Sequence, residues 1–224
     1  MSTNGKGKIV ILLGAPGAGK GTQAQMLQER FSWPQVSTGD ILRAIAKTDT
    51  DLGREVARIQ KAGDLVSDEI LADVVRHRTS QPDCAGGYIL DGFPRTIAQA
   101  EMLEELAREQ DREVQAVYVR VERPELMRRL TGRRTCPLCN EIYNMHTRPP
   151  RNNSFCDKHE TDVELVHRDD DHESVVENRI TKWADVTKPV YDYYRSTDRL
   201  TTVNGASPVA EVFAQICAEL GVVC

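Results

Sequence analysis

A glycine-rich loop between an apolar run and a helical pattern constrains the fold of this 224-residue chain more than any other feature. The run Lys8–Leu13 is short, continuous and rich in β-branched residues, as expected of a buried parallel strand. The loop Gly14–Thr22 follows directly, and Gln23–Leu27 begins a helical pattern. Glycines let successive backbone N–H groups face one anion, and the helix N-terminus adds partial positive charge. This segment predicts a phosphate-binding loop, with Lys20 reaching the β- and γ-phosphates of a nucleotide. A plain glycine-rich turn is the alternative, which the flanking strand and helix disfavour.

The rest of the chain alternates strand and helix patterns. Further strand patterns occur around Val36 and at Tyr88–Leu90, Ala116–Val121 and Leu200–Val203. Helical patterns separate them, for example at Ile97–Arg108. Such alternation predicts right-handed βαβ units, and so an α/β fold with a parallel sheet covered by helices on both faces. Residues 173–197 have the pattern of one long helix, which Pro189 should kink or divide.

Two segments interrupt this alternation. Residues 37–66 contain short helical patterns, at 39–47 and 51–61, without a strand signal. Residues 132–171 are rich in Cys, Pro, Asn, Arg and Asp. The second segment cannot build much apolar core, so it needs an additional cross-link, which its cysteines could supply.

Two cysteine and histidine pairs in the second segment have the spacing of a metal site. The pairs are Cys136 with Cys139, and Cys156 with His159. Tetrahedral Zn²⁺ binds thiolates and imidazole, and four protein ligands leave no open position, so we expect a structural zinc. A metal-free segment held by polar contacts, or an adventitious disulfide, is the alternative. His146 and His167 could replace His159, but neither lies in such a pair, and Cys84, Cys217 and Cys224 receive no role.

The loop departs from the usual phosphate-loop pattern at the position that normally binds magnesium. The residue after Lys20 is Gly21, where such loops usually carry a magnesium-binding Ser or Thr, and Thr22 follows one position later. We therefore expect Mg²⁺ to be held largely through water. Asp91 is the best remaining carboxylate, because it ends a predicted strand beside the ligand crevice of an open α/β sheet. An Asp that only caps a turn is the alternative.

Composition restricts the partners and the location. The net charge is −5, which does not favour general binding to nucleic acid or to an anionic membrane. The chain shows no signal-peptide pattern and no apolar run long enough for a membrane span. A cytoplasmic enzyme acting on small molecules is the expectation.

Several motifs, taken in order, carry a resemblance to a known family. They are Gly14–Thr22, Ser37–Arg43 (STGDILR), Asp91–Thr96 (DGFPRT), Gly132–Arg134 and Arg168–Asp170. In order and spacing they resemble the adenylate kinase family over almost the whole chain. The resemblance implies a monomer whose P-loop core comprises residues 1–36, 67–131 and 172–224. It also implies a monophosphate-binding insert at 37–66 and a lid at 132–171, in which His159 is a variation on a family pattern of cysteines or Asp.

The resemblance also implies the nucleotide contacts. ATP would be held by Gly17, Ala18, Gly19, Lys20, Gly21, Thr22, Arg129, Arg133, Ile142, Tyr143 and Ser207. AMP would be held by Thr38, Arg43, Asp64, Leu65, Val66, Gly92, Phe93, Pro94, Arg95 and Gln99, with Arg168 and Arg179 reaching its phosphate. The catalytic set would be Lys20, Arg95, Arg133, Arg168, Arg179 and Asp91.

The chemistry of phosphoryl transfer supports the arginines independently. Two polyanionic nucleotides must meet end to end, and guanidinium groups bind phosphate bidentately without losing their charge. The attacking phosphate oxygen is already anionic, so neither a nucleophilic side chain nor a general base is needed. Gln99 can donate to and accept from an adenine edge, although a polar surface glutamine is the alternative. The resemblance also favours an AMP acceptor, because Thr38 matches the adenylate-type pattern, whereas kinases for pyrimidine monophosphates tend towards Ala there.

Two rival functions remain open at this point. The first is a related kinase that acts on UMP, CMP or GMP, or that uses GTP as donor. The second is a nucleic-acid-binding or protein-binding zinc ribbon grafted onto an inactive P-loop domain. The acidic net charge and the lack of aromatics among the basic residues disfavour this second function.

Overall fold

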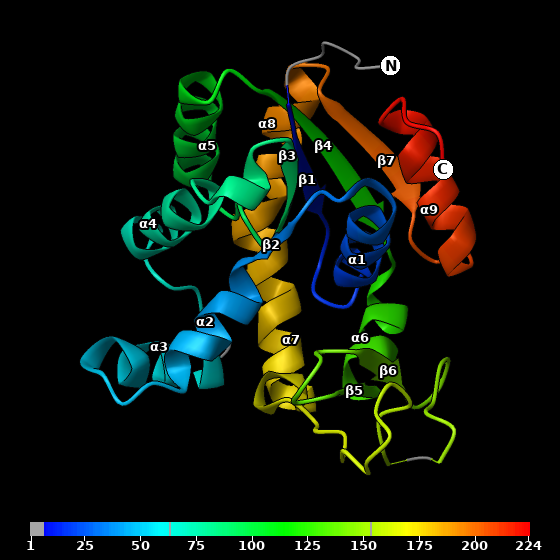
Figure 1. Ribbon diagram of the computed structural model, residues 1–224. Coiled ribbons are helices and arrows are strands. Elements are labelled where there is room, and N and C mark those ends of the chain that lie inside the picture. Colours follow the sequence, from blue (N-terminus) through cyan, green and yellow to red (C-terminus); the bar gives the residue numbers. More distant parts are fainter. Residues whose placement is uncertain (1–6, 63, 153) are drawn as a thin grey trace.

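The centre of the molecule is a five-stranded parallel sheet in the order β2-β3-β1-β4-β7 (Figure 1). The computed structural model describes residues 7–62, 64–152 and 154–224. The strands are β1 (Lys8–Leu13), β2 (Gln35–Ser37), β3 (Gly87–Asp91), β4 (Glu113–Arg120) and β7 (Leu200–Asn204). Each predicted strand is present, and β1 pairs with β3 on one side and β4 on the other. The carboxyl ends of β1 and β3 therefore meet at one edge of the sheet.

Alternate residues of β1 enter two separate core layers. Ile9 and Ile11 pack into one apolar cluster, while Val10 and Leu12 pack into the other. The first cluster is completed by α4 (Asp68–Thr79), α5 (Ile97–Glu109) and α8 (Lys188–Ser196). The second is completed by α1 (Lys20–Phe31), α6 (Arg123–Thr131), α7 (Glu173–Lys182) and α9 (Val209–Glu219). This confirms the predicted α/β fold with a sheet buried on both faces.

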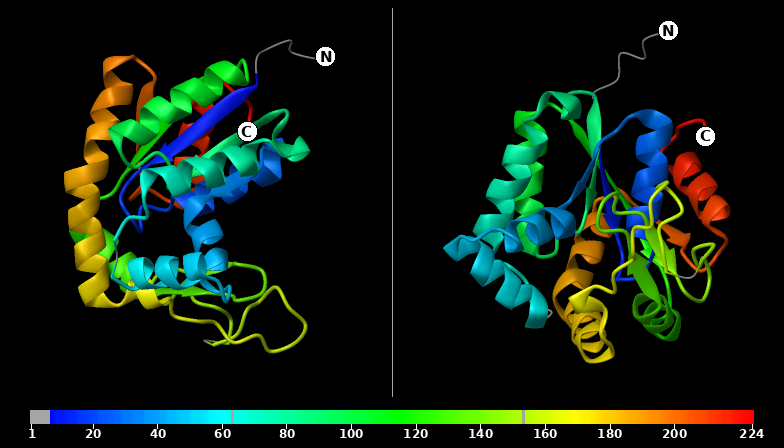
Figure 2. Two further views of the ribbon diagram at one scale, coloured as in Figure 1. Left: turned by 90° about the vertical axis from the view of Figure 1, so that its left-hand side faces the viewer. Right: turned by 60° about the horizontal axis from the view of Figure 1, so that its bottom comes forward.

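The two interrupting segments lie beyond the same edge of the sheet (Figures 1 and 2). The first contains α2 (Thr38–Ala46) and α3 (Asp51–Ala62), close to the helical patterns in the sequence. The second contains an antiparallel pair, β5 (Arg133–Thr135) and β6 (Ile142–Asn144), which the sequence analysis did not predict. These strands are only three residues long, too short for an alternating pattern to be recognised. The division into core, insert and lid stays a prediction.

A helical column runs along one side of the molecule and connects residues 132–171, the predicted lid segment, to the central sheet (Figure 2, left). It consists of α7, a π-helical turn η3 (Trp183–Thr187) and α8. Pro189 is the second residue of α8, two positions after the end of η3. Because proline lacks an N–H group and clashes with the preceding turn, the regular hydrogen-bond ladder breaks there. The prediction that Pro189 divides this helix is confirmed.

The C-terminal end is tied to α9 by a disulfide between Cys217 and Cys224. Neither cysteine was assigned a role from the sequence, because two isolated cysteines carry no spacing signal. Within the described ranges, no helix combines the length and the apolar character that crossing a membrane requires.

Candidate active site

The glycine-rich loop curls around the amino group of Lys20, the first residue of α1. Lys20 Nζ donates to the carbonyl oxygens of Gly14 and Ala15 at 2.9 and 3.0 Å. Gly17 has a φ of +83°, and a Cβ there would lie 2.8 Å from Leu130 Cγ, so only glycine fits this turn. Burial lowers the pKa of Lys20 to about 8, against the opposing pull of Asp91. The lysine is thus held inside the loop, in a position suited to a phosphate group.

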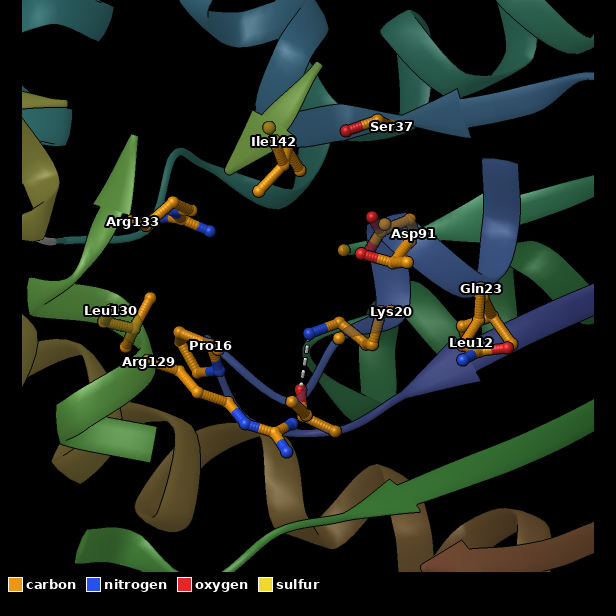
Figure 3. Close-up of a pocket in the computed structure, with 18 of the residues that line it drawn as sticks. Leu12, Pro16, Lys20, Gln23, Ser37, Asp91, Arg129, Leu130, Arg133 and Ile142 are labelled. Carbon is orange, nitrogen blue, oxygen red and sulfur yellow. Dashed lines mark hydrogen bonds between the residues drawn. The ribbon is translucent and has the colours of Figure 1, made fainter. Parts of the chain in front are cut away.

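Asp91 faces the loop from the end of β3. Its Oδ2 accepts a hydrogen bond from Gln35 Nε2 at 3.3 Å. A Cβ at Gly21 would lie 3.5 Å from the same oxygen, an ordinary contact distance, so position 21 lies directly beside this carboxylate. Figure 3 shows Asp91 beside the Lys20 side chain. The carboxylate caps no turn among the described residues, which favours the magnesium role over the turn-capping alternative.

A cleft of about 750 Å³ opens between this loop and the two interrupting segments. Apart from Thr38 and Gln99, every residue that the sequence analysis assigned to ATP or AMP lines it. In Figure 3, the side chains of Lys20 and Arg133 reach from opposite sides toward the same space, and Arg129 runs along the loop. Residues far apart in the sequence therefore converge on one crevice large enough for phosphates and their nucleosides.

A buried aspartate organises two of the arginines. Arg133 donates to both oxygens of Asp171, at 2.7 and 2.5 Å, and Arg179 Nη1 lies 3.1 Å from the same carboxylate. Arg179 also pairs with Asp170 Oδ2 at 3.0 Å. Asp171 has no exposed surface. Burial acts to lower the pKa of Arg133, but Asp171, together with the nearby Asp170 and Asp40, outweighs burial and raises that pKa. The two guanidinium groups are fixed before any nucleotide binds.

Two other arginines keep most of their charge uncompensated. Burial, together with the neighbouring Arg179, lowers the pKa of Arg95 to about 10. Burial and the nearby Arg133 likewise lower the pKa of Arg168 to about 10. Among the described residues, Arg168 Nε donates to a neutral group, Thr135 Oγ1, at 2.9 Å. Both side chains remain charged at neutral pH, and a bound polyanion would relieve the repulsion that they experience from Arg179 and Arg133.

Thr38 and Gln99 stand behind the cleft rather than in it. Thr38 Oγ1 donates to the carbonyl oxygen of Gly92 at 2.9 Å, and Arg95 Nε donates to the same oxygen at 2.8 Å. Gly92 has a φ of +85°, and a Cβ there would lie 2.8 Å from Thr38 Oγ1. Gln99 is completely buried, so the surface-glutamine alternative is wrong. Its contact with adenine stays a prediction.

The remaining predicted residues come from three further elements. Arg129, in α6, pairs with Glu125 at 2.8 Å. Ile142 and Tyr143 come from β6, and Ser207 follows β7. The Tyr143 hydroxyl accepts from the Asp157 N–H at 2.8 Å, which ties β6 to the second cysteine pair.

The four predicted metal ligands gather in the lid segment. The ligand atoms of Cys136, Cys139, Cys156 and His159 all lie within 4.8 Å of one another. Cys139 Sγ lies 3.7 Å from Cys156 Sγ, and Cys136 Sγ lies 3.4 Å from His159 Nε2. A tetrahedral zinc with bonds of about 2.3 Å separates its ligands by about 3.8 Å, so the donor set fits Zn²⁺. His146 and His167 are not part of this cluster.

The acidic partners of the arginines were not predicted from the sequence. Asp171, Asp170 and Asp40, which pairs with Arg43, hold guanidinium groups in place. The acidic run after Arg168 was a signal for the first two, because buried arginines need carboxylate partners. Lys182 and Trp183 also line the cleft, but one helix residue among many carries no such signal.

The geometry defines a class of protein. A phosphate loop that faces a second group of arginines across a single crevice suits a P-loop kinase, which passes a phosphoryl group between two bound nucleotides.

Comparison with known proteins narrows this class. A family model described as adenylate kinase matches residues 12–199. An adenylate kinase from Nitrosococcus oceani is 44% identical over 207 residues, which cover 92% of this chain and 95% of that protein. Those from Thermodesulfovibrio yellowstonii and Archaeoglobus fulgidus are each 43% identical over 212 residues, covering 94% of this chain and 98% and 97% of the relatives. The chain belongs to the adenylate kinase family.

Proposed function

We propose that this protein catalyses the reversible transfer of the terminal phosphoryl group of ATP to AMP, giving two ADP. The observation that carries this proposal is the convergence of the Lys20 loop and the Arg95, Arg168 and Arg179 side chains on one cleft. The relatives named adenylate kinase support AMP as the acceptor. The alternative function, a zinc ribbon grafted onto an inactive P-loop domain, does not account for these arginines.

The transfer is a direct in-line displacement. An oxygen of the AMP phosphate forms a bond to the γ-phosphorus of ATP as the bond to the β,γ-bridging oxygen breaks, and that electron pair leaves with ADP. Lys20 and Arg133 neutralise the donor phosphates, and Arg95 and Arg168 hold the acceptor. Arg179, fixed by Asp170 and Asp171, stabilises charge on the transferred group. No covalent intermediate with the protein forms.

Magnesium would enter with ATP. Asp91 would hold it largely through water, since Gly21 offers no hydroxyl. The ion supplies positive charge at the donor phosphates.

The lid segment would carry a structural zinc held by the three cysteines and His159. Rigid closure of this segment would exclude water that otherwise hydrolyses ATP.

We further propose a monomer located in the cytoplasm. The Cys217–Cys224 disulfide is unusual for that location, because cytoplasmic thiols are kept reduced. Thiol trapping during rapid lysis would show whether the disulfide exists in the cell.

A substrate panel tests the function. Purified protein with ATP and Mg²⁺ should form ADP rapidly with AMP, and far more slowly with GMP, CMP or UMP. Faster turnover with another acceptor would favour the related-kinase alternative, and no turnover with any acceptor would overturn the proposal.

Arg168→Lys should lower turnover by at least about a hundredfold, because an ammonium group cannot replace a bidentate guanidinium. The matched control is Arg151→Lys, a change at an exposed lid arginine.

A further inference from the structure

The amide of Gln99 is held from two sides by groups with opposite requirements. Its Oε1 accepts from the backbone N–H of Arg95 at 2.7 Å, and its Nε2 donates to Asp68 Oδ1 at 2.6 Å. An ionised carboxylate only accepts, and a backbone N–H only donates. The orientation of this amide is therefore determined by its partners: rotation by 180° would place two donors against each other at Arg95 and two acceptors at Asp68.

Asp68 lies next to the part of the cleft that would hold the acceptor nucleotide. It is the first residue of α4, two positions after Val66, which lines the cleft. Its second oxygen, Oδ2, accepts from Thr96 Oγ1 at 3.0 Å, and Thr96 caps the N-terminus of α5. One half-buried carboxylate thus joins the start of α4 to the start of α5 and to Gln99. Asp68 itself does not line the cleft.

Among the described residues, the fixed amide has one N–H and one oxygen lone pair left over. Gln99 is fully buried and does not line the cleft in the ligand-free protein, so a base contacts them only after the acceptor side of the cleft opens around it. An amide carries two N–H donors and two acceptor sites on its oxygen, and the protein uses one of each. The Watson–Crick edge of adenine offers an amino donor beside a ring-nitrogen acceptor, whereas guanine offers a carbonyl acceptor beside an N–H donor. The two bases therefore require opposite orientations of the same amide.

We propose that Asp68 is a positioning residue for base selection: by holding Gln99 Nε2, it sets the amide in one orientation and so favours adenine over guanine in the acceptor. This inference rests on the proposed use of AMP as acceptor. It deepens that proposal by assigning the discrimination to a carboxylate outside the cleft.

The experiment compares Asp68→Ala with Asp73→Ala, a change at an exposed aspartate on the same helix. Steady-state kinetics are measured with AMP and with GMP at saturating ATP, and with ATP at saturating AMP. In Asp68→Ala, we expect the KM for AMP to rise about tenfold and the AMP-to-GMP ratio of kcat/KM to fall about tenfold, because a buried hydrogen bond is lost. The KM for ATP should stay within twofold of the wild-type value.

Asp68→Asn, which has the same shape, should lie between these limits, because its side chain both donates and accepts and so constrains the amide less. It also serves as the test variant if Asp68→Ala does not fold. The proposal is overturned if the folded variants keep the KM for AMP and the AMP-to-GMP ratio within twofold of the Asp73→Ala values. A role confined to helix stability would lower the melting temperature without changing that ratio. If wild-type protein and Asp73→Ala form no ADP from ATP and AMP, the proposed function itself has failed, a result distinct from an unchanged ratio.

Discussion

At the scale of single residues, the site stores positive charge in buried positions before any ligand is present. Lys20 is satisfied by two carbonyl oxygens, which only partly offset the burial of its charge. Arg133 and Arg179 instead share the carboxylate of Asp171. These two ways of compensating a buried cation predict different responses to pH and to mutation.

Lys20 should make ATP binding sensitive to mildly alkaline pH. Its pKa in the free protein is about 8, lowered by burial, and phosphate binds the protonated form. Affinity is therefore fully present below this pKa and should fall as pH rises above it, by up to about tenfold per unit. Titration calorimetry from about pH 7 to about pH 9 measures this slope. Lys20→Arg, whose side chain keeps its charge throughout, should bind with a flat profile. Equal slopes in both proteins would show that another group titrates.

Asp171 should be costly to remove from the ligand-free protein. Asp171→Ala leaves Arg133 and Arg179 buried without their shared partner, and breaking such a pair costs about 3–5 kcal/mol. Urea unfolding measures the loss. The neighbouring Asp169 is exposed, so Asp169→Ala should change stability by less than about 0.5 kcal/mol. A similar loss in both variants would mean that the acidic run matters only through its total charge.

At the scale of elements, the parts predictable from the sequence are those that a local pattern defines. The strand–loop–helix at Lys8–Leu27 and the buried strands follow from apolar runs, and Pro189 marked the break between α7 and α8. The β5–β6 pair was not predictable, because its two three-residue strands are stabilised by contacts across the lid segment. The roles of Asp171 and Asp68 were not predictable either, because they depend on partners distant in the sequence.

The lid segment should depend on one histidine for its metal. His159→Ala removes a ligand from the cluster, whereas His146→Ala changes a lid histidine outside it. We expect elemental analysis to find one zinc per chain in wild-type protein and in His146→Ala, and clearly less in His159→Ala. Chelation should lower the melting temperature of the first two and leave nucleotide binding at the Lys20 loop intact. Unchanged melting with chelator, together with no metal in wild-type protein, would reject a structural zinc.

At the scale of the whole molecule, the C-terminal disulfide should add stability without affecting catalysis. Closing a loop of this length removes about 2–3 kcal/mol of conformational freedom from the unfolded chain. Cys224→Ser should lose about that much in urea unfolding while keeping wild-type kinetics, because both cysteines lie outside the cleft. Val223→Ser, a change at an exposed neighbour, serves as the control. Unfolded, unreduced protein should show two fewer free thiols than its six cysteines; six free thiols would contradict the bond.

The position of β1 in the sheet has a consequence for synthesis on the ribosome. This strand emerges before either partner, and the partners end only at Asp91 and Arg120, so more than half of the 224 residues must be translated before both of its edges are paired. Until then a nascent chain carries a largely apolar segment with unsatisfied backbone groups, which is prone to aggregation. Chains arrested before Arg120 should therefore need a chaperone to stay in solution, while chains released after it can bury the segment themselves.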